Sequence, residues 1–424
     1  MKTLFTNAKI LTLVDNEDIF EGELVVDGDT IVFVGKKAPQ GTYEKTIDCG
    51  GNLLMPGFKN AHTHSAMSFA RSLADDLALH EWLFDKIFPL EAKIQPEDQY
   101  HLSKVSILEY LTSGMTACFD MYYNPEEMAK ASLQMGFRTV LLGTVTKYRE
   151  SVEEMKESYH RINGRSPLVS YRLGYHAEYT CTEEILKALS EASHELKCPI
   201  FTHISETFDE VEGCKERHHG QSPVEYMESL GLLDYGGGGF HCVAFSDHDI
   251  ALFKKHGASV ISCPGSNSKL ASGIAPLKKF YAAGLNIGLG TDGPASDNGL
   301  DMFYEMRLAC VLQKLLNHDP AACDAVHSLQ AATVGSAKAM GLDQCLYLAK
   351  GQQADIVMID LMKPNMQPFN NLAKNLVYSG AKDDVKMTMI AGVIRYMDGK
   401  FYVGEDVKDI YKKAQEITDR LKAN

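Results

Sequence analysis

The two ends of the chain share a pattern of short runs in which apolar and polar positions alternate. One such run covers residues 23–28, and the same texture returns late in the chain at 354–359. Alternation with a period of two is typical of strands with one buried face. We expect the ends, residues 1–55 and 350–424, to form one small β-sandwich domain. Apolar residues at helical spacing over about 407–421 predict a packing helix at the end of the chain.

Between the two ends, short apolar strands alternate with longer amphipathic stretches. Seven strands are predicted, at residues 115–121, 138–144, 168–175, 199–202, 238–240, 259–262 and 285–289. The apolar run that begins at Leu53 and precedes His62 adds an eighth. Eight β/α units over about 300 residues match the size of a (β/α)8 barrel. We therefore expect an α/β fold whose TIM-like barrel spans residues 56–349, with the active site at the carboxyl ends of its strands.

Composition narrows the class of function. The chain has 424 residues, 45% of them hydrophobic, which is enough for a sizeable core. The formal net charge of -14 argues against a nucleic-acid or membrane surface, because both need clustered Lys and Arg. A small-molecule substrate is the expected partner, and a homo-oligomer stays an open alternative.

The cysteines and the N-terminal residues indicate the cellular compartment of the protein. The ten cysteines are scattered and include no Cys-x-x-Cys pair, which favours reduced thiols over a disulfide framework. Asn7 and Lys9 interrupt the apolar N-terminal segment too early for a signal peptide. No uncharged apolar stretch reaches the length of a membrane span. These features predict a cytoplasmic protein.

Two histidines, His62 and His64, follow the first predicted barrel strand. Strand residues at i and i+2 point the same way, so the pair can present two imidazoles to one divalent ion. Paired surface histidines are ordinary, and this pair alone does not specify a metal site. Four more candidate residues each follow a short β-like run, namely His176, His203, His241 and Asp292. Since strand ends converge in a barrel, the fold and the metal-site hypotheses support each other.

Three imidazoles and one carboxylate suit a borderline cation such as zinc, with a position left for water. Iron or another divalent ion stays an alternative. The candidate ligands are His62, His64, His203 and Asp292. Asp292 could instead cap a Gly-rich turn, and residues 288–293 also match the pattern G-x-G-x-x-G of dinucleotide sites. A dinucleotide site is disfavoured, because residues 288–293 come at the end of the strand series and no clear acidic residue closes a following βαβ unit.

Glu206 lies three residues after His203, where a carboxyl group can pass a proton to or from a metal-bound water. The alternative is a solvated glutamate at a helix start. His241 could orient the water or a developing alkoxide, and the alternative is a structural histidine. His176 and Glu178 form a His-x-Glu pair like that of cytidine deaminases, but the required Pro-Cys-x-x-Cys is absent, which excludes that zinc fold.

Five motifs carry a family resemblance. They are Met55-Pro56-Gly57-Phe58, His62-Thr63-His64, residues 203–206 (His-Ile-Ser-Glu), 263–270 (Cys-Pro-Gly-Ser-Asn-Ser-Lys-Leu) and 290–296 (Gly-Thr-Asp-Gly-Pro-Ala-Ser). In this order, over essentially the whole chain, they resemble the amidohydrolase superfamily. More narrowly, they are similar to its mononuclear-zinc deaminases of 5′-methylthioadenosine and S-adenosylhomocysteine.

The resemblance implies a barrel plus β-sandwich and assigns roles to the residues named above. It implies one zinc ion on His62, His64, His203 and Asp292. It also implies proton transfer by Glu206 and Asp292, with His241 beside the reacting centre. No lysine stands at the end of the fourth predicted strand, where binuclear relatives place a bridging carboxylated lysine, so one metal ion is expected.

The resemblance further maps three residues onto the substrate. Glu91 would bind the ribose hydroxyls, although without the resemblance it would be called a solvated helix residue. His176 would contact the substrate, and Arg149 matches an arginine that holds the amino-acid carboxylate of S-adenosylhomocysteine. Two positions depart from the family pattern: Gly143 stands where some relatives carry a second arginine, and Glu178 replaces a proline.

The implied activity is zinc-dependent hydrolytic deamination of a 5′-modified adenine nucleoside, which releases ammonia and the inosine analogue. Its substrate would be 5′-methylthioadenosine, S-adenosylhomocysteine or 5′-deoxyadenosine. An alternative on the same scaffold is a deaminase or chlorohydrolase of guanine, cytosine or a triazine. An alternative of another class is a non-catalytic metal-binding barrel, against which the presence of both Glu206 and Asp292 counts.

Overall fold

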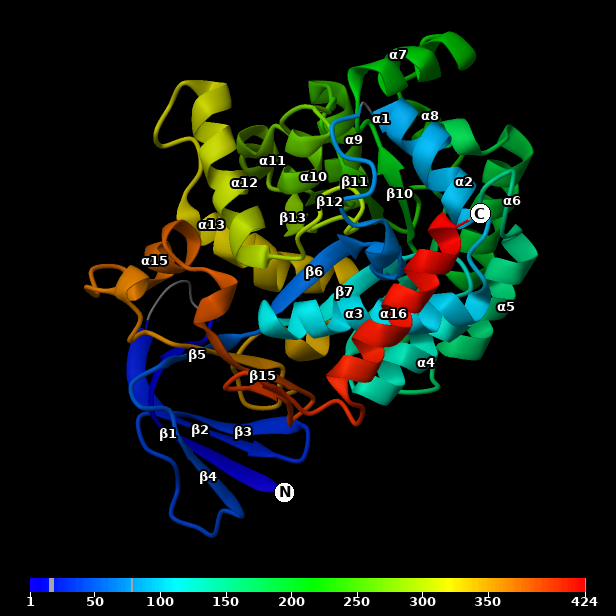
Figure 1. Cartoon of the computed structure of the whole chain (residues 1–424). Helices are drawn as coiled ribbons and strands as arrows, with labels where there is room; N and C mark the ends of the chain where they lie inside the picture. Colours follow the sequence, from blue (N-terminus) through cyan, green and yellow to red (C-terminus); the bar gives the residue numbers. More distant parts are fainter. Residues whose placement is uncertain (15–18, 78, 424) are drawn as a thin grey trace.

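The computed structural model describes residues 1–14, 19–77 and 79–423, and Figure 1 shows their arrangement. Within these residues, eight parallel strands form a barrel and nine further strands form a separate mixed sheet. Helices surround the barrel, and the mixed sheet lies at one end of the molecule together with the N-terminus (Figure 1). The predicted α/β fold, a TIM-like barrel with a small sheet domain formed by both chain ends, is confirmed.

The barrel strands are neighbours in space in the order of the sequence. They are β6 (Phe58–Thr63), β7 (Met115–Met121), β8 (Arg138–Leu142), β9 (Val169–Gly174), β10 (Ile200–Ile204), β11 (Gly237–His241), β12 (Ser259–Ser262) and β13 (Asn286–Leu289). The seam between β13 and β6 is bridged just beyond β13. There the Asp292 N–H donates to the His62 carbonyl at 3.0 Å, and the Thr291 N–H donates to Asn60 Oδ1 at 3.0 Å.

Most helices of the barrel lie on its outside (Figure 1). The full series is α3 (Pro96–Thr112), α4 (Pro125–Met135), α5 (Val152–Ile162), α6 (Glu183–Leu196), α7 (Phe208–Arg217), α8 (Pro223–Ser229), α9 (Asp247–His256), α10 (Pro264–Lys269), α11 (Leu277–Ala283), α12 (Met302–Asn317), α13 (Ala325–Gln330) and α14 (Ser336–Met340). Its last member, α14, instead packs into the same core as inward-facing side chains of the barrel strands. The segment between β6 and α3 contains the short helices α1 (Leu79–Glu81) and α2 (Phe88–Glu91). Side-chain caps fix several helix starts. Before α5, for example, Ser151 Oγ accepts the Glu154 N–H at 3.2 Å.

The mixed sheet joins strands from both chain ends. They are β1 (Lys2–Leu11), β2 (Ile19–Asp27), β3 (Thr30–Gly35), β4 (Lys45–Asp48), β5 (Leu53–Pro56), β14 (Ile356–Ile359), β15 (Val385–Ile390), β16 (Val393–Met397) and β17 (Lys400–Phe401). The two ends meet where β5 pairs antiparallel with β14. Two helices belong to the C-terminal part, α15 (Leu372–Tyr378) and α16 (Val407–Lys422). The predicted C-terminal helix is confirmed as α16, which packs against α3 (Figure 1).

The strands β5 and β14 are buried on both faces. In β5, Leu54 belongs to the core of the mixed sheet, whereas Leu53 and Met55 belong to the main core that includes the outer side of the barrel. In β14, Met358 likewise belongs to the core of the mixed sheet and Val357 to the main core. Because strand side chains alternate in direction, each of these two strands packs one face into the core of the mixed sheet and the other into the main core around the barrel. The two strands therefore join the mixed sheet to the barrel. The exact division of domains at residues 55/56 and 349/350 stays a prediction.

The first predicted barrel strand needs a correction. The apolar run from Leu53 onward is not one strand, because β5 belongs to the mixed sheet and the barrel begins with β6. The chain passes from one sheet to the other at Gly57, where a Cβ atom would lie 2.2 Å from Thr116 Cγ2. Only glycine fits this close approach. As a result, His62 lies within β6 rather than after the strand.

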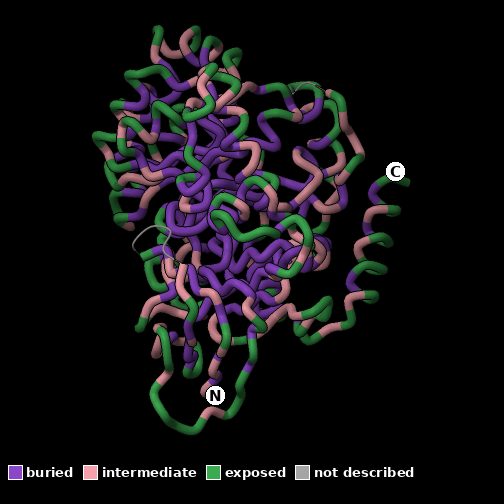
Figure 2. Tube along the Cα trace, turned by 90° about the vertical axis from the view of Figure 1, so that its left-hand side faces the viewer, coloured by how far each residue is buried: buried purple, intermediate pink, exposed green. Residues whose placement is uncertain are grey.

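Burial is highest where the barrel strands run, and exposed residues follow the outer helices and the loops of the mixed sheet (Figure 2). In the part of the chain that the structure describes, no helix combines the length and the apolar character that a membrane span requires.

Candidate active site

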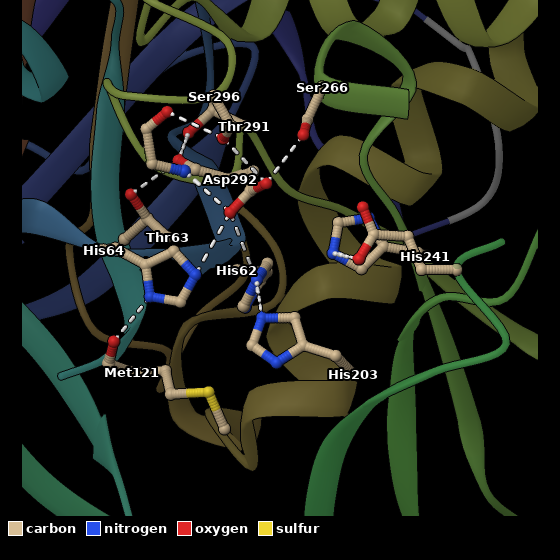
Figure 3. Close-up of polar contacts among 12 residues, drawn as sticks. His62, Thr63, His64, Met121, His203, His241, Ser266, Thr291, Asp292 and Ser296 are labelled. Atoms are coloured by element: carbon tan, nitrogen blue, oxygen red, sulfur yellow. Dashed lines mark hydrogen bonds and ion pairs between the residues drawn. The ribbon is translucent and has the colours of Figure 1, made fainter. Parts of the chain in front are cut away.

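The candidate residues meet at the carboxyl ends of the barrel strands. His62, His203 and His241 lie at or near the last residues of β6, β10 and β11. His64, His176 and Asp292 follow β6, β9 and β13 within three residues. Figure 3 shows that the side chains of His62, His64, His203 and Asp292 point toward one another. Carboxyl strand ends are where TIM barrels place active sites.

Backbone carbonyls orient two of the histidine rings. His64 Nδ1 lies 2.6 Å from the Met121 carbonyl oxygen, and His203 Nδ1 lies 2.7 Å from that of His176. A ring nitrogen at this distance from a carbonyl donates its hydrogen, so Nε2 of the neutral ring is left with a lone pair. In both rings Nε2 faces the centre of the cluster.

The inner atoms of the cluster lie close together. His62 Nε2 lies 3.1 Å from His203 Nε2 and 3.5 Å from Asp292 Oδ1, and His64 Nε2 lies 3.1 Å from the same oxygen. The ligand atoms of His62, His64 and Asp292 all lie within 4.8 Å of one another, as do those of His62, His203 and His241. This arrangement could hold one metal ion.

The charges of these groups also fit a cation. Burial lowers the pKa of His62 to about 3 and the pKa of His203 well below its usual value, so both rings are neutral. Burial, the largest single effect, would raise the pKa of Asp292, but the close contacts of its carboxylate with the His62 and His64 rings hold that pKa well below its usual value. Burial, the largest single effect, would lower the pKa of His64, but its contact with Asp292 makes the net shift upward. Zinc takes neutral imidazoles and an ionised carboxylate as donors, so a bound cation would displace a proton from His64.

A second layer of hydrogen bonds fixes the Asp292 carboxylate. Ser266 Oγ and Ser296 Oγ donate to Oδ2 at 2.7 and 2.8 Å, and the Gly293 N–H donates to Oδ1 at 2.8 Å (Figure 3). The backbone at Asp292 has a φ of 59°, which turns its side chain toward the cluster, and His241 has a similar φ of 70°. Such left-handed conformations of non-glycine residues are concentrated at functional sites.

Glu206 and His241 form a second pair beside the cluster. Glu206 Oε2 lies 3.9 Å from His241 Nε2, and Ser272 Oγ donates to Glu206 Oε1 at 3.3 Å. The Nδ1 of His241 lies 2.8 Å from Asn267 Oδ1, which directs its Nε2 toward Glu206. Burial raises the pKa of the Glu206 carboxyl group. A carboxyl group with a raised pKa is suited to hold and donate a proton near neutral pH.

One pocket opens onto both the cluster around Asp292 and the Glu206–His241 pair. His64, His176, His203, Glu206, His241 and Asp292 line its polar end, and Trp82, Leu83, Ile87 and Phe88 contribute an apolar wall. Glu91 from α2 also lines the pocket and is buried, with its Oε1 accepting a hydrogen bond from the Tyr122 hydroxyl at 2.6 Å. Burial raises the pKa of Glu91 and lowers that of His176 to about 4.

Arg149 lies outside this pocket. It lines a neighbouring groove between the segment 145–153 and α6, and its guanidinium carbon lies 4.6 Å from the centre of the Tyr123 ring. Tyr123 itself lines the pocket, so Arg149 is separated from the pocket by one side chain. Its predicted contact with a substrate carboxylate stays a prediction.

The sequence does not predict several groups that shape the site. The Glu210 carboxylate accepts the N–H groups of Ser205 and Glu206, each at 2.8 Å, and so fixes the backbone that carries Glu206. Its position four residues after Glu206 is a weak signal, since solvated helix glutamates are common at such positions. Ser266 and Asn267 lie inside the motif 263–270, which could have indicated them. No sequence signal marks Trp82, the one tryptophan of the chain.

Comparisons with known proteins identify the family to which the chain belongs. The sequence model of the amidohydrolase family matches residues 53–395. A 5-methylthioadenosine/S-adenosylhomocysteine deaminase of Thermoanaerobacter pseudethanolicus is 35% identical over 433 residues, covering 99% of this chain and 100% of the relative. A 5'-deoxyadenosine deaminase of Methanopyrus kandleri is 36% identical over 386 residues, covering 89% of each. The crystal structure of an adenosine deaminase from Xanthomonas campestris with bound zinc superposes with a TM-score of 0.94 at 30% identity. That match covers 100% of this chain and 99% of the other.

Proposed function

The chain belongs to the amidohydrolase family and is a metal-dependent aminohydrolase, and we propose that it deaminates an adenine nucleoside with a modified 5′ position. One observation carries the proposal. A cluster of three histidines and Asp292 shares a pocket with Glu206, a buried carboxyl group whose raised pKa suits it to carry a proton. The named deaminase relatives favour this enzyme over a non-catalytic metal-binding barrel.

The proposed substrates are 5′-methylthioadenosine, S-adenosylhomocysteine and 5′-deoxyadenosine. The names of the relatives support them, since all three compounds are adenine nucleosides that differ at the 5′ carbon. The pocket is compatible with such a ligand. The Glu91 carboxyl group can accept hydrogen bonds from ribose hydroxyls, and the wall around Trp82 and Phe88 offers apolar surface to a ring or a thioether.

We propose zinc as the metal, with one ion per chain held by His62, His64, His203 and Asp292. The donor set and the zinc in the Xanthomonas campestris structure support this choice. When bound, the ion supplies a Lewis acid that lowers the pKa of a water molecule toward neutrality. The carbonyls of Met121 and His176 keep the Nε2 lone pairs of His64 and His203 directed at this position.

The protein's own groups move the protons. The ionised Asp292 carboxylate accepts the proton of the attacking water as carbon 6 of the purine is hydrated. Glu206, whose pKa is raised by burial, donates a proton to the ring nitrogen and so makes carbon 6 more electrophilic. His241, with its ring fixed by Asn267, presents Nε2 to the reacting centre. Asp292 then returns its proton to the amino group, which leaves as ammonia, and the hydroxyl proton passes to Glu206 as the carbonyl group of the inosine analogue forms.

A substrate panel tests the proposal. On zinc-loaded protein, ammonia release would give kcat/KM for 5′-methylthioadenosine, S-adenosylhomocysteine, 5′-deoxyadenosine, adenosine and guanine. We expect the 5′-modified nucleosides to exceed adenosine and guanine by tenfold or more, about 1.4 kcal/mol at the transition state. Activity on guanine, cytosine or a triazine alone would replace the nucleoside proposal with the free-base alternative. A cytoplasmic location and a homo-oligomer remain further expectations.

A further inference from the structure

Two cysteines lie in contact far from the pocket. Cys310 belongs to α12, and Cys323 directly precedes Asp324, the residue that caps α13. Their Sγ atoms are 3.5 Å apart, and both side chains are buried, with 0% and 4% exposure. No other two cysteines in the described part of the chain share a hydrogen bond, and neither Cys310 nor Cys323 lines the pocket. The helices α12 and α13 lie on the outside of the barrel near α15 (Figure 1).

The surroundings of this thiol pair favour one reactive sulfur. A hydrogen bond from the Cys323 thiol lowers the pKa of Cys310 against the opposing effect of burial, and the nearby Lys314 ammonium adds to this shift. Lys314 follows Cys310 by one helical turn, and its Nζ donates to the Cys323 carbonyl at 3.0 Å. Positive charge and thiol donors stabilise a thiolate, which is the form that reacts with oxidants.

We propose that Cys310 and Cys323 are a modification site, at which a small hydroperoxide oxidises the two thiols to an intramolecular disulfide. The sulfurs need to close from 3.5 Å to about 2.05 Å, a short movement for a helix side chain and a residue at a helix start. Burial of both sulfurs favours hydrogen peroxide over a bulky disulfide as the oxidant. A transient disulfide of this kind is compatible with thiols that are otherwise kept reduced.

The chemistry proceeds in two balanced steps. The Cys310 sulfur attacks one peroxide oxygen, so that an S–O bond forms and the O–O bond breaks, leaving a sulfenic acid and one water. The Cys323 sulfur then attacks Cys310 Sγ, the S–S bond forms, the S–O bond breaks and a second water leaves. In total the two thiols lose two electrons and two protons, and hydrogen peroxide is reduced to two waters. The adjacent second thiol favours this outcome over further oxidation of Cys310.

The experiment uses the full-length, metal-loaded protein treated with hydrogen peroxide while folded. Thiol titration after denaturation should fall from the ten cysteines of the sequence to eight, with a mass about 2 Da lower. Non-reducing peptide mapping should join the peptides of Cys310 and Cys323, and a reductant should restore ten thiols. Cys345→Ser, which changes a buried cysteine elsewhere, should still form the cross-link.

Variants of Cys323 and of the neighbouring Lys314 test the roles of the second thiol and of the positive charge. Cys323→Ser should abolish the cross-link and let Cys310 proceed to the sulfinic acid. Lys314→Gln should slow cross-linking several-fold, and Lys314→Arg should retain the rate, because the arginine keeps the charge. The proposal is overturned if ten thiols still titrate after free glutathione in the same solution has been oxidised. It is also overturned if the cross-link joins other cysteines or if wild-type Cys310 and Cys323 are oxidised separately.

Discussion

His62 Nε2 and His203 Nε2 lie 3.1 Å apart, although 141 positions separate the two residues in the sequence. Since His203 Nδ1 donates to the His176 carbonyl, its Nε2 has a lone pair to offer. Two ring nitrogens this close together can bind one cation between them. We therefore predict about one tightly bound divalent ion per chain, because the described residues bring together one set of four proposed ligands.

Metal analysis of purified protein checks this number. His203→Ala should lose most of the metal, and Glu206→Gln is the matched control that should retain it. Removal of the ion with a chelator should abolish deamination, and addition of zinc should restore it. Two ions per chain, or an unchanged content in His203→Ala, would contradict the mononuclear site.

The second prediction concerns Glu206. Glu206→Gln should keep the metal but lose roughly two to four orders of magnitude in kcat, the usual contribution of a positioned acid–base group. The amide occupies the same space and cannot titrate. Steady-state kinetics on 5′-methylthioadenosine measures the loss. Turnover within a few-fold of wild type would make Glu206 a structural residue.

The pH profile of kcat gives a third prediction. Burial raises the pKa of Glu206, so its protonated form persists to higher pH than that of an exposed glutamate. If Glu206 acts as the acid, kcat should be high below this raised pKa and fall as pH rises through it. The residual activity of Glu206→Gln should lack that falling limb. An identical limb in wild type and variant would assign the titration to another group.

The fourth prediction separates substrates. A guanidinium and a carboxylate form a bidentate, charge-assisted contact, so Arg149→Met should lower kcat/KM for S-adenosylhomocysteine by roughly tenfold or more, about 1.4 kcal/mol. Methylthioadenosine has no carboxylate and should be nearly unaffected. Lys147→Met, which removes an exposed cation from the same loop, is the control. Equal losses on both substrates would mean that Arg149 supports Tyr123, on which it stacks, rather than the ligand.

The apolar runs predict the number and order of the barrel strands, because strands buried on both faces are continuously apolar. The same rule fails at Leu53, since β5 of the mixed sheet and β6 of the barrel are both buried on two faces and only Gly57 marks the change of sheet. Residues at or just after strand ends, such as His203 and Asp292, are predictable because a barrel gathers strand ends. Trp82 and Glu210 are not, because their positions depend on loop paths and packing.

The seam of the barrel has a consequence for the order of assembly. Thr63 Oγ1 donates to the Asp292 carbonyl at 2.9 Å across 229 positions of the sequence, beside the two histidines that flank Thr63. During synthesis, His62 and His64 therefore leave the ribosome long before the carboxylate that completes their set. A nascent or truncated barrel that lacks β13 offers histidines without that carboxylate. High metal affinity is then a property of the finished fold, and metal uptake reports that the first and last strands have met.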